Sequence, residues 1–381
     1  MNGMTDIQYD IAVIGAGTMG MAAASFLTAR GAKTLVIDAF DPPHDKGSHH
    51  GDTRMIRQAY GEGRQYVALV KRAQTLWEEL DRETAYPVFQ KTGVLGLGPA
   101  DSVFLNEMIA SADEHDLSLQ RLSSADIMNR WPGLSVPDDY IGCFETESGL
   151  LYSENAIRAY RERAVRNGAT LAMNTPVVSI TPTAVGITIA TRNETFHAKK
   201  VIVTVGAWAK QLLPDISLPL QPTRKVVGWF DADETLFSDT AFPSFFVEDD
   251  ERMFYGFPSL DGSGLKVGRT DGGQPIEPGI HTQDFGRYDA DEGDLRQFLS
   301  TYMPAANGPL KRGKTCLYTM SSDHDFIVDF HPEHDSILFA CGFSGHGFKF
   351  GSVMGEVLSE LTLNGETPFD LSRFRLSRFQ A

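Results

Sequence analysis

A β-α-β unit close to the N-terminus places the strongest constraint on how this chain can fold. Residues 10–14 form a continuous apolar run, which is typical of a parallel strand buried on both faces of a sheet. Residues 19–30 are rich in Ala, Leu and Met and predict a helix, which Gly31 ends. Residues 34–37 predict a second buried strand. The unit therefore predicts an α/β fold built on a parallel sheet.

Three glycines between the first strand and the helix predict a dinucleotide site. Gly15, Gly17 and Gly20 match the pattern G-x-G-x-x-G, in which glycine allows a tight turn and a close approach of backbone to a pyrophosphate at the helix N-terminus. Asp38 follows the second strand and can accept hydrogen bonds from ribose hydroxyls. A tight turn without a ligand is the alternative, and this context does not separate NAD from FAD.

The length and charge of the chain narrow the classes of protein further. With 381 residues, the chain predicts two domains or one elaborated α/β unit. The formal net charge of -16 argues against nucleic acid and anionic lipid as partners. Neither a membrane span nor a secretory signal is predicted, because the apolar segments have only strand length and no basic stretch precedes them. Three cysteines without metal-ligand spacing favour a reducing cytoplasm and predict no metal site.

The rest of the pattern predicts a domain organisation in which the chain crosses between two domains several times. The predicted elements are a helix over 66–80, antiparallel strands around 92–97, a helix over 155–166, a buried parallel strand over 200–206, strand fragments at 225–230 and 253–257, and a closing strand and helix over 336–340 and 353–361. The predicted nucleotide domain comprises residues 1–88, 150–218 and 320–381, and the predicted sheet-rich substrate domain comprises 89–149 and 219–319.

Two loops carry candidate site chemistry. Residues 48–57 concentrate histidines and arginines, and an arginine there suits a substrate carboxylate because the guanidinium fork matches carboxylate oxygens. Residues 342–350 combine three glycines with His346 and Lys349 before a helix, which would bring backbone donors to a cofactor or an anion. A solvated basic loop and a plain helix bend are the alternatives. Local sequence alone predicts Cys316 as a small buried cysteine and Lys266 as a solvated lysine.

Several longer stretches resemble the monomeric sarcosine oxidase and N-methyltryptophan oxidase family, nearly from end to end. The matching stretches are residues 38–44, 47–54, 59–63, 130–133, 255–258 and 342–350. The resemblance implies a Rossmann-like FAD-binding domain of the glutathione reductase type and an α+β substrate domain. It also implies FAD as the cofactor and a monomer that acts on a small N-methyl amino acid with oxygen.

The resemblance implies roles at the flavin for individual residues. Cys316 falls where members carry FAD as a thioether on the 8α carbon, and Lys266 falls where a lysine activates oxygen. Arg54 and His50 match residues packed near the flavin. The expected cofactor-binding residues are Gly15, Gly17, Gly20, Asp38, Cys316, Gly345, His346, Gly347, Phe348 and Lys349. The expected catalytic residues are Lys266, Arg54, His50 and Tyr255.

Among the residues that the resemblance places near the substrate, one differs from the family pattern. Arg57 and Lys349 fall where the substrate carboxylate is held, and Tyr255 matches a tyrosine near the substrate. Members have a histidine where this chain has Thr270, which leaves the choice of amine open. Phe246 falls in the segment that lines the substrate cavity and would reshape it.

Sarcosine is the favoured substrate, because the matching stretches between residues 218 and 334 resemble sarcosine oxidase more than N-methyltryptophan oxidase. The C-terminal run over residues 374–380 leans towards N-methyl-L-tryptophan oxidase, and another N-alkyl amino acid is a further alternative. A NAD(P)-dependent dehydrogenase and a non-catalytic flavin-binding protein are alternatives of other classes. Lys266 together with Lys349 argues against the latter.

Overall fold

The first predicted strand lies at the centre of a parallel sheet. The computed structural model describes residues 8–250, 252–279 and 283–379. In it, β1 (Tyr9–Ile14) pairs in parallel with β2 (Thr34–Ile37) and with β12 (Thr195–Val203), while β9 (Thr170–Ala172) flanks β2 and β20 (His334–Cys341) flanks β12. The last four residues of β1 are all buried, as a strand covered on both faces requires. The predicted parallel sheet is confirmed.

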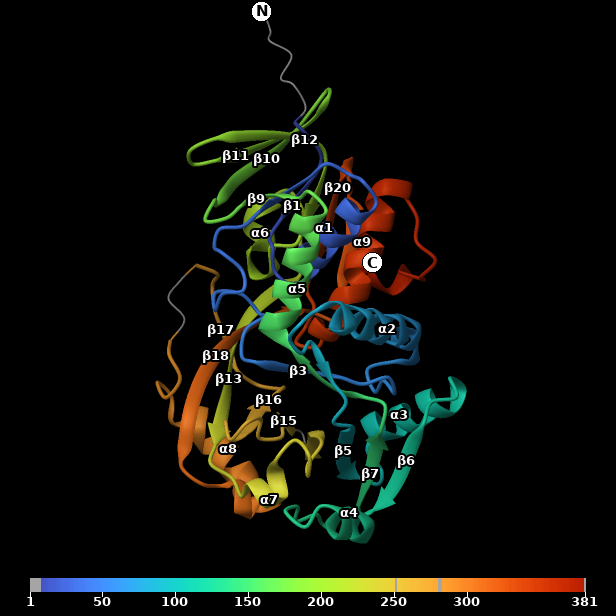
Figure 1. Ribbon diagram of the computed structural model, residues 1–381, viewed down its shortest axis with the longest axis vertical. Helices are drawn as coiled ribbons and strands as arrows, with labels where there is room; N and C mark the ends of the chain where they lie inside the picture. Colours follow the sequence, from blue (N-terminus) through green and yellow to red (C-terminus); the bar gives the residue numbers. More distant parts are fainter. Residues whose placement is uncertain (1–7, 251, 280–282, 380–381) are drawn as a thin grey trace, which may run out of the picture.

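Antiparallel strands extend this sheet at two places. A hairpin of β10 (Val177–Thr183) and β11 (Gly186–Thr191) pairs with the first half of β12 and forms one end of the molecule (Figure 1). The strand β19 (Ile327–His331) pairs antiparallel with β20. The closing strand therefore returns to the nucleotide sheet, as the sequence predicts.

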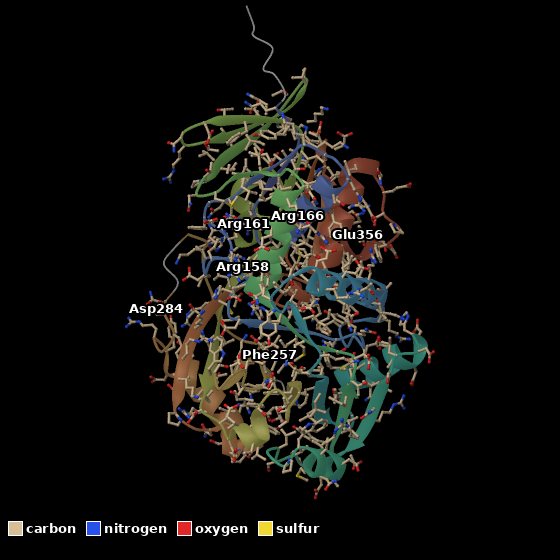
Figure 2. The ribbon with its side chains drawn as sticks, in the orientation of Figure 1. Arg158, Arg161, Arg166, Phe257, Asp284 and Glu356 are labelled. Carbon is tan, nitrogen blue, oxygen red and sulfur yellow. The ribbon has the colours of Figure 1, made fainter. Side chains whose placement is uncertain are left out.

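Four helices pack around the parallel sheet. α1 (Thr18–Ala29) lies between α5 (Ser153–Arg166) and α9 (Gly351–Asn364), and α2 (Val67–Glu83) packs on α9. Ion pairs accompany this packing: Arg72 on α2 donates to Glu356 on α9 over 2.8 Å. Arg158, Arg161 and Arg166 project from α5, and Glu356 lies on α9 (Figure 2).

A second, larger sheet forms the other end of the molecule (Figure 1). Its order is β17-β13-β16-β15-β14-β5-β7-β6, with β18 also on β13, and all pairs are antiparallel except β14 with β5. The strands are β5 (Val94–Pro99), β6 (Leu119–Ser123), β7 (Tyr140–Glu145), β13 (Leu220–Phe230), β14 (Ser244–Asp249), β15 (Arg252–Phe257), β16 (Leu265–Arg269), β17 (Gln274–Pro275) and β18 (Leu310–Ser321). Its helices are α3 (Val103–Glu114), α4 (Ser124–Arg130), α7 (Glu234–Phe237) and α8 (Asp289–Tyr302).

Short elements connect the two sheets. A three-stranded sheet of β3 (Thr53–Ile56), β8 (Gly149–Tyr152) and β4 (Phe89–Gln90) lies between them in Figure 1. The remaining helices are α6 (Ala209–Leu212) and the 3-10 helices η1 (Arg64–Tyr66), η2 (Gly206–Trp208), η3 (Pro304–Ala306), η4 (Phe348–Phe350), η5 (Ser372–Phe374) and η6 (Leu376–Phe379). None of the described helices combines the length and apolarity needed to cross a bilayer.

The predicted strand over 200–206 is wrong at its C-terminal end, since β12 stops at Val203. The Thr204 N–H makes the last ladder bond, to the Ile14 carbonyl (2.8 Å), and the strand ends there because β1 passes into the glycine loop, where the Thr204 hydroxyl donates to the Gly15 carbonyl (2.7 Å). The domain boundaries stay a prediction, and β18 crosses the expected boundary after residue 319. Residues 1–7, 251, 280–282 and 380–381, which fall in the predicted domains, lie outside the described residues.

A buried ion pair ties α8 to β13. The Arg224 side chain is 1% exposed, and its guanidinium donates to both carboxylate oxygens of Asp291 over 2.8 Å. It also donates to the carbonyls of Gln283 (2.8 Å) and Asp284 (2.9 Å), and Asp284 is labelled in Figure 2. Removing one partner of such a pair leaves a buried charge uncompensated.

We expect Asp291→Asn to lower the free energy of unfolding by about 3 kcal/mol, because Arg224 would keep its charge in a buried site. The thermal midpoint and the urea midpoint of the purified protein measure this loss. The matched control is Asp113→Asn, which removes the exposed partner of Arg121 and should change stability by less than about 0.5 kcal/mol. Equal shifts for the two variants would contradict the assignment.

Candidate active site

The glycine loop presents unpaired backbone donors at the start of α1. Gly20 must lack a side chain, because a Cβ atom there would lie 1.8 Å from the Gly15 carbonyl oxygen. Among the described residues, the N–H groups of Thr18 and Met19 have no protein acceptor, and the first turn holds no acidic side chain. Free N–H groups and the positive end of the helix dipole together favour an anion such as a phosphate.

A cavity of about 590 Å³ opens over this loop. Gly15, Gly17 and Asp38 line it from the nucleotide sheet, and Gly345 and Phe348 line it from the C-terminal turn. The Asp38 carboxylate accepts from the Ala16 N–H (2.6 Å) and from the Phe40 N–H (2.8 Å), so it is fixed at the cavity wall.

A second cavity, of about 600 Å³, adjoins the first. It is lined by the predicted substrate residues Arg57, Phe246, Tyr255, Thr270 and Lys349. The residues that line both cavities are Arg54, Tyr318, Ser344, Gly345 and Phe348. These shared residues show that the two cavities meet at one wall, so a ligand in the first could contact a ligand in the second.

Arg57 is a buried cation that already holds a carboxylate. Its side chain is 4% exposed, so the alternative of a solvated basic loop is wrong at this position. The guanidinium donates to the Ala59 carbonyl (2.9 Å) and pairs with Glu62 over 2.6 Å. Burial opposes ionisation of Glu62, but the charge and hydrogen bond of Arg57, together with the charge of Lys349 and other neighbours, outweigh it and lower the pKa of Glu62 to about 2. The guanidinium is therefore placed and charged to bind a carboxylate.

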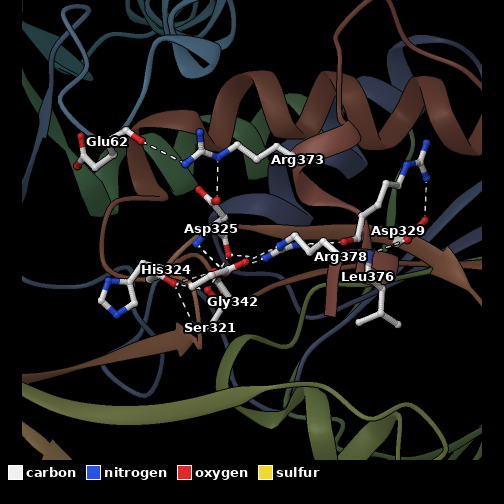
Figure 3. Close-up of polar contacts among 12 residues, drawn as sticks. Glu62, Ser321, His324, Asp325, Asp329, Gly342, Arg373, Leu376 and Arg378 are labelled. Atoms are coloured by element: carbon white, nitrogen blue, oxygen red, sulfur yellow. Dashed lines mark hydrogen bonds and ion pairs between the residues drawn. The ribbon is translucent and has the colours of Figure 1, made fainter. Parts of the chain in front are cut away.

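The segment that carries Glu62 is fixed from the C-terminal end of the chain (Figure 3). Arg373 donates to the Glu62 carbonyl (3.4 Å) and to the Asp325 carboxylate (2.7 Å). Asp325 also accepts from the Tyr66 hydroxyl (2.7 Å). The C-terminal segment thus helps to position the rim of the second cavity.

Among the buried cations of the described residues, Lys349 has the fewest hydrogen-bond partners. Its ammonium donates only to the Tyr60 hydroxyl (3.4 Å) within the described part of the chain, and the Tyr60 ring also faces Arg57, whose Cζ lies 4.6 Å from the ring centroid. The helix turn η4 carries Lys349 and is anchored by Trp77, whose indole donates to the Lys349 carbonyl over 2.7 Å. Burial, reinforced by the charge of Arg57, lowers the pKa of Lys349 to about 7. An ammonium with one long hydrogen bond is suited to receive an anion.

Lys266 lines neither cavity, but its Nζ atom lies 4.7 Å from the centroid of the Phe257 ring, which lines the second. Its side chain is 2% exposed, so the local prediction of a solvated lysine is wrong. The ammonium donates to the Gly51 carbonyl (2.5 Å) and to the carbonyl and hydroxyl of Thr53 (2.9 and 3.1 Å). Burial and the charge of Arg54 lower the pKa of Lys266, whereas three acceptors favour its ammonium form.

Cys316 is buried on β18 near these cations but lines neither cavity. Burial raises the pKa of its thiol, and the charges of Arg54, Lys266 and Lys225 oppose that rise. Tyr318, two residues on, points from the same face of the strand and lines both cavities. Cys316 therefore stands next to the wall at which the cavities meet.

His50 and Gly347 are predicted residues that line neither cavity, whereas His346 lines one of them. His50 is 5% exposed, and its Nδ1 atom has no partner within the described part of the chain. Burial, with the charge of Arg54, lowers the pKa of His50 to about 4, so the ring is neutral at pH 7. Gly347 packs against the Phe343 side chain instead of facing a cavity. His346 lines the second cavity only.

Several site residues were missed by the sequence analysis. These are Glu62, Phe104, Lys225 and Tyr318, which all line the second cavity, and Tyr60, which contacts both Arg57 and Lys349. The period of two along a strand could have indicated Tyr318, because it shares a face with Cys316. No local signal indicates Lys225, which is brought in by pairing across β13 and β18.

Comparison with known proteins identifies the family. The model of the family described as DAO, FAD dependent oxidoreductase, matches residues 10–361 of this chain. The chain belongs to this family. The expected family, the α/β fold class and the class of FAD-dependent amine oxidase are thereby confirmed.

Two relatives of this family are similar along their whole length. The chain is 51% identical over 374 residues to the monomeric sarcosine oxidase of Bacillus sp. (strain B-0618), covering 97% of this chain and 96% of the relative. It is 45% identical over 376 residues to the N-methyl-L-tryptophan oxidase of Escherichia coli O139:H28 (strain E24377A / ETEC), covering 98% and 100%. The crystal structure of L-proline dehydrogenase from P. horikoshii shares the fold, with a TM-score of 0.86, 21% identity and 99% of both chains covered.

The first cavity fits the FAD of this family. The unpaired N–H groups at the start of α1 suit its pyrophosphate, and the Asp38 carboxylate suits a ribose. The buried Thr319 hydroxyl lines the cavity and has no partner among the described residues, as expected of a group that contacts a cofactor.

We expect a small carboxylate such as acetate to bind the flavin-loaded enzyme more tightly below pH 7 than above it. Lys349 is charged below its pKa of about 7 and loses its proton above it, so affinity should fall by up to about tenfold per pH unit. The change in flavin absorbance on titration with acetate measures this affinity. Lys349→Arg should remove the pH dependence, because a guanidinium does not titrate in this range. A profile that keeps its break near pH 7 in this variant would contradict the role of Lys349.

Proposed function

We propose that this enzyme oxidatively demethylates an N-methyl amino acid, with sarcosine as the preferred substrate. The products are the amino acid, formaldehyde and hydrogen peroxide. The observation that carries the proposal is the pair of buried cations, Arg57 and Lys349, in a cavity that shares a wall with the cofactor cavity. The names of the two relatives, each an oxidase of an N-methyl amino acid, support it.

The residues of the second cavity would bind and orient the substrate. Arg57 and Lys349 would hold its carboxylate, which places the N-methyl group towards the shared wall at Tyr318. Glu62 already occupies the guanidinium of Arg57, so it must share or yield this position when a substrate carboxylate enters. Tyr255, within 3.4 Å of the Tyr318 hydroxyl, and Phe246 would complete the wall around the amine. When bound, FAD would supply the redox chemistry, which is a two-electron oxidation of the amine with oxygen as the final acceptor.

Lys266 would serve the oxygen half of the reaction. Its ammonium is held by three acceptors from the loop that also carries Arg54, close to the wall between the cavities. A fixed positive charge in a buried site stabilises the negative charge that develops on oxygen as it is reduced. Arg54, whose guanidinium donates to the Thr53 carbonyl (2.7 Å), would add to the same field.

Sarcosine is preferred in the proposal because apolar rings crowd the space beside Arg57. Phe104 and Phe246 lie 5.1 and 5.3 Å from its Cζ atom, and Phe246 packs edge-on to Phe104. N-methyl-L-tryptophan is the second candidate. It is favoured by Thr270, which occupies less volume than the histidine expected there, and by apolar lining residues such as Met253.

A hydrogen peroxide assay should show turnover with sarcosine above that with N-methyl-L-tryptophan, L-proline or a fructosyl amino acid. The ratio of kcat/KM values ranks these substrates by their stabilisation of the transition state. A higher kcat/KM for N-methyl-L-tryptophan would instead establish the second candidate. Peroxide production with none of the four would contradict the proposed function.

We further propose that FAD is attached covalently through Cys316. The support is its position beside the shared wall and the cations Arg54, Lys225 and Lys266, which favour the thiolate that forms a thioether. On acid precipitation, the yellow colour should stay with the pellet of the wild-type protein and move to the supernatant for Cys316→Ser. The control is Cys341→Ser, another buried free cysteine, which should retain the colour in the pellet. Release of colour from the wild-type protein would disprove the covalent link and leave the FAD assignment intact.

The monomeric state and the cytoplasmic location predicted from the sequence are also proposals. The monomeric state is supported by the name of the relative from Bacillus sp. (strain B-0618). The three cysteines are free and buried in the structure, which supports a reducing compartment.

A further inference from the structure

A buried lysine that lines the second cavity makes backbone contacts that the proposed chemistry does not use. Lys225, on β13, is 5% exposed. Its ammonium donates to three successive backbone carbonyls, those of Thr270, Asp271 (3.0 Å) and Gly272. These three residues form the turn between β16 and β17, and all of them line the second cavity together with Lys225.

The turn lies so close to β13 that a lysine stem fills the space beneath it. Gly273 has φ of 91°, and a Cβ atom there would lie 2.5 Å from the Arg224 carbonyl oxygen and 3.0 Å from the Cδ atom of Lys225. The turn is also joined to β15, since the Thr270 N–H donates to the Met253 carbonyl over 2.7 Å. Lys225 supplies the donors for the carbonyls on the other side of the turn.

Lys225 also touches the wall that the two cavities share. Its Nζ atom lies 5.2 Å from the centroid of the Tyr318 ring, and Lys225 pairs with Cys316 across the β13–β18 ladder. Although burial lowers the pKa of Lys225 to about 8, its ammonium form prevails at pH 7 and has a donor for each of the three carbonyls. One side chain therefore links the turn that bears Thr270 to the residues expected beside the flavin.

We propose that Lys225 is a positioning residue for substrate selectivity, which holds the turn over residues 270–272 at a fixed distance from Tyr318. The inference rests on the proposed function in that the second cavity is taken as the substrate site. A rigid wall beside Thr270 limits the size of the N-alkyl group and side chain that the cavity admits. Without the ammonium, the carbonyls of the half-buried Thr270 and Asp271 and of the exposed Gly272 lose the donor that they share, and the turn is no longer tied to β13.

The test compares Lys225→Met and Lys225→Arg in the flavin-loaded enzyme. Methionine keeps the length and volume of the stem and removes the donors, whereas arginine restores several donors. For Lys225→Met we expect KM for sarcosine to rise about tenfold with kcat changed less than about threefold, because positioning and not chemistry is impaired. The selectivity for sarcosine over the bulkier N-ethylglycine should fall in the same variant, and Lys225→Arg should restore both quantities to within about threefold of wild type.

The matched control is Lys200→Met on β12. This lysine also donates to a carbonyl, that of Thr362, but belongs to the other sheet. It should leave KM and selectivity unchanged. If Lys225→Met lowers kcat and leaves KM and selectivity unchanged, or if the control has the same effect, the proposal is wrong.

A second measurement does not depend on the substrate. Hydrogen exchange in the flavin-loaded enzyme should become faster across residues 269–273 in Lys225→Met and stay at the wild-type rate in Lys200→Met. Unchanged exchange in Lys225→Met would overturn the positioning role. If exchange responds as expected but no N-methyl amino acid is oxidised by the wild-type protein, the proposed function fails and the structural role of Lys225 stands.

Discussion

The burial of positive charge beside the cofactor cavity is the constraint on which the rest of the site depends. Arg54, Arg57, Lys225, Lys266 and Lys349 surround one small region, although the chain as a whole carries a net charge of -16. Isolated buried cations are costly, and carboxylate partners would cancel the field that an anionic ligand needs. The structure resolves this conflict largely with backbone carbonyls, which satisfy the donors while leaving the net charge in place.

This solution explains why loops and turns, not helix or strand centres, surround the cations. Carbonyls inside regular strands and helices are already paired, whereas those of residues 48–51, of Thr53 at the start of β3 and of residues 270–272 can accept from side chains. Lys349 differs, because its single long hydrogen bond to Tyr60 leaves most of its donor capacity to a ligand. Arg57 is intermediate in the number of donors that remain for a ligand, because its guanidinium already pairs with the carboxylate of Glu62. The cations thus differ in how many of their donors the protein itself occupies, and those with fewer occupied donors are better suited to bind a ligand.

Much of the fold could be predicted because its strongest signals are local. The parallel strands over 10–14 and 34–37 and the helix between them follow from apolar runs and glycine, and the structure confirms them. The end of the strand over 200–206 could not be predicted. Thr204 is β-branched and could continue a strand, but its partner strand β1 ends at Ile14, where the chain enters the glycine loop. Likewise, nothing in the sequence around Lys266 indicates that its ammonium donates hydrogen bonds to three acceptors in a distant loop.

The sequence by itself determined the dinucleotide unit and, through long matching stretches, the family with its cofactor. These features depend on short contiguous segments, because residues that are neighbours along the chain in such segments are also neighbours in space. Only the tertiary structure decided that Tyr60 lies between Arg57 and Lys349, residues on opposite ends of the chain, and that Lys225 supports the turn at Thr270. Such contacts depend on how β13 pairs with β18 and how the C-terminal turn returns to the first loop, and strand pairing between distant segments leaves no periodic trace in the sequence.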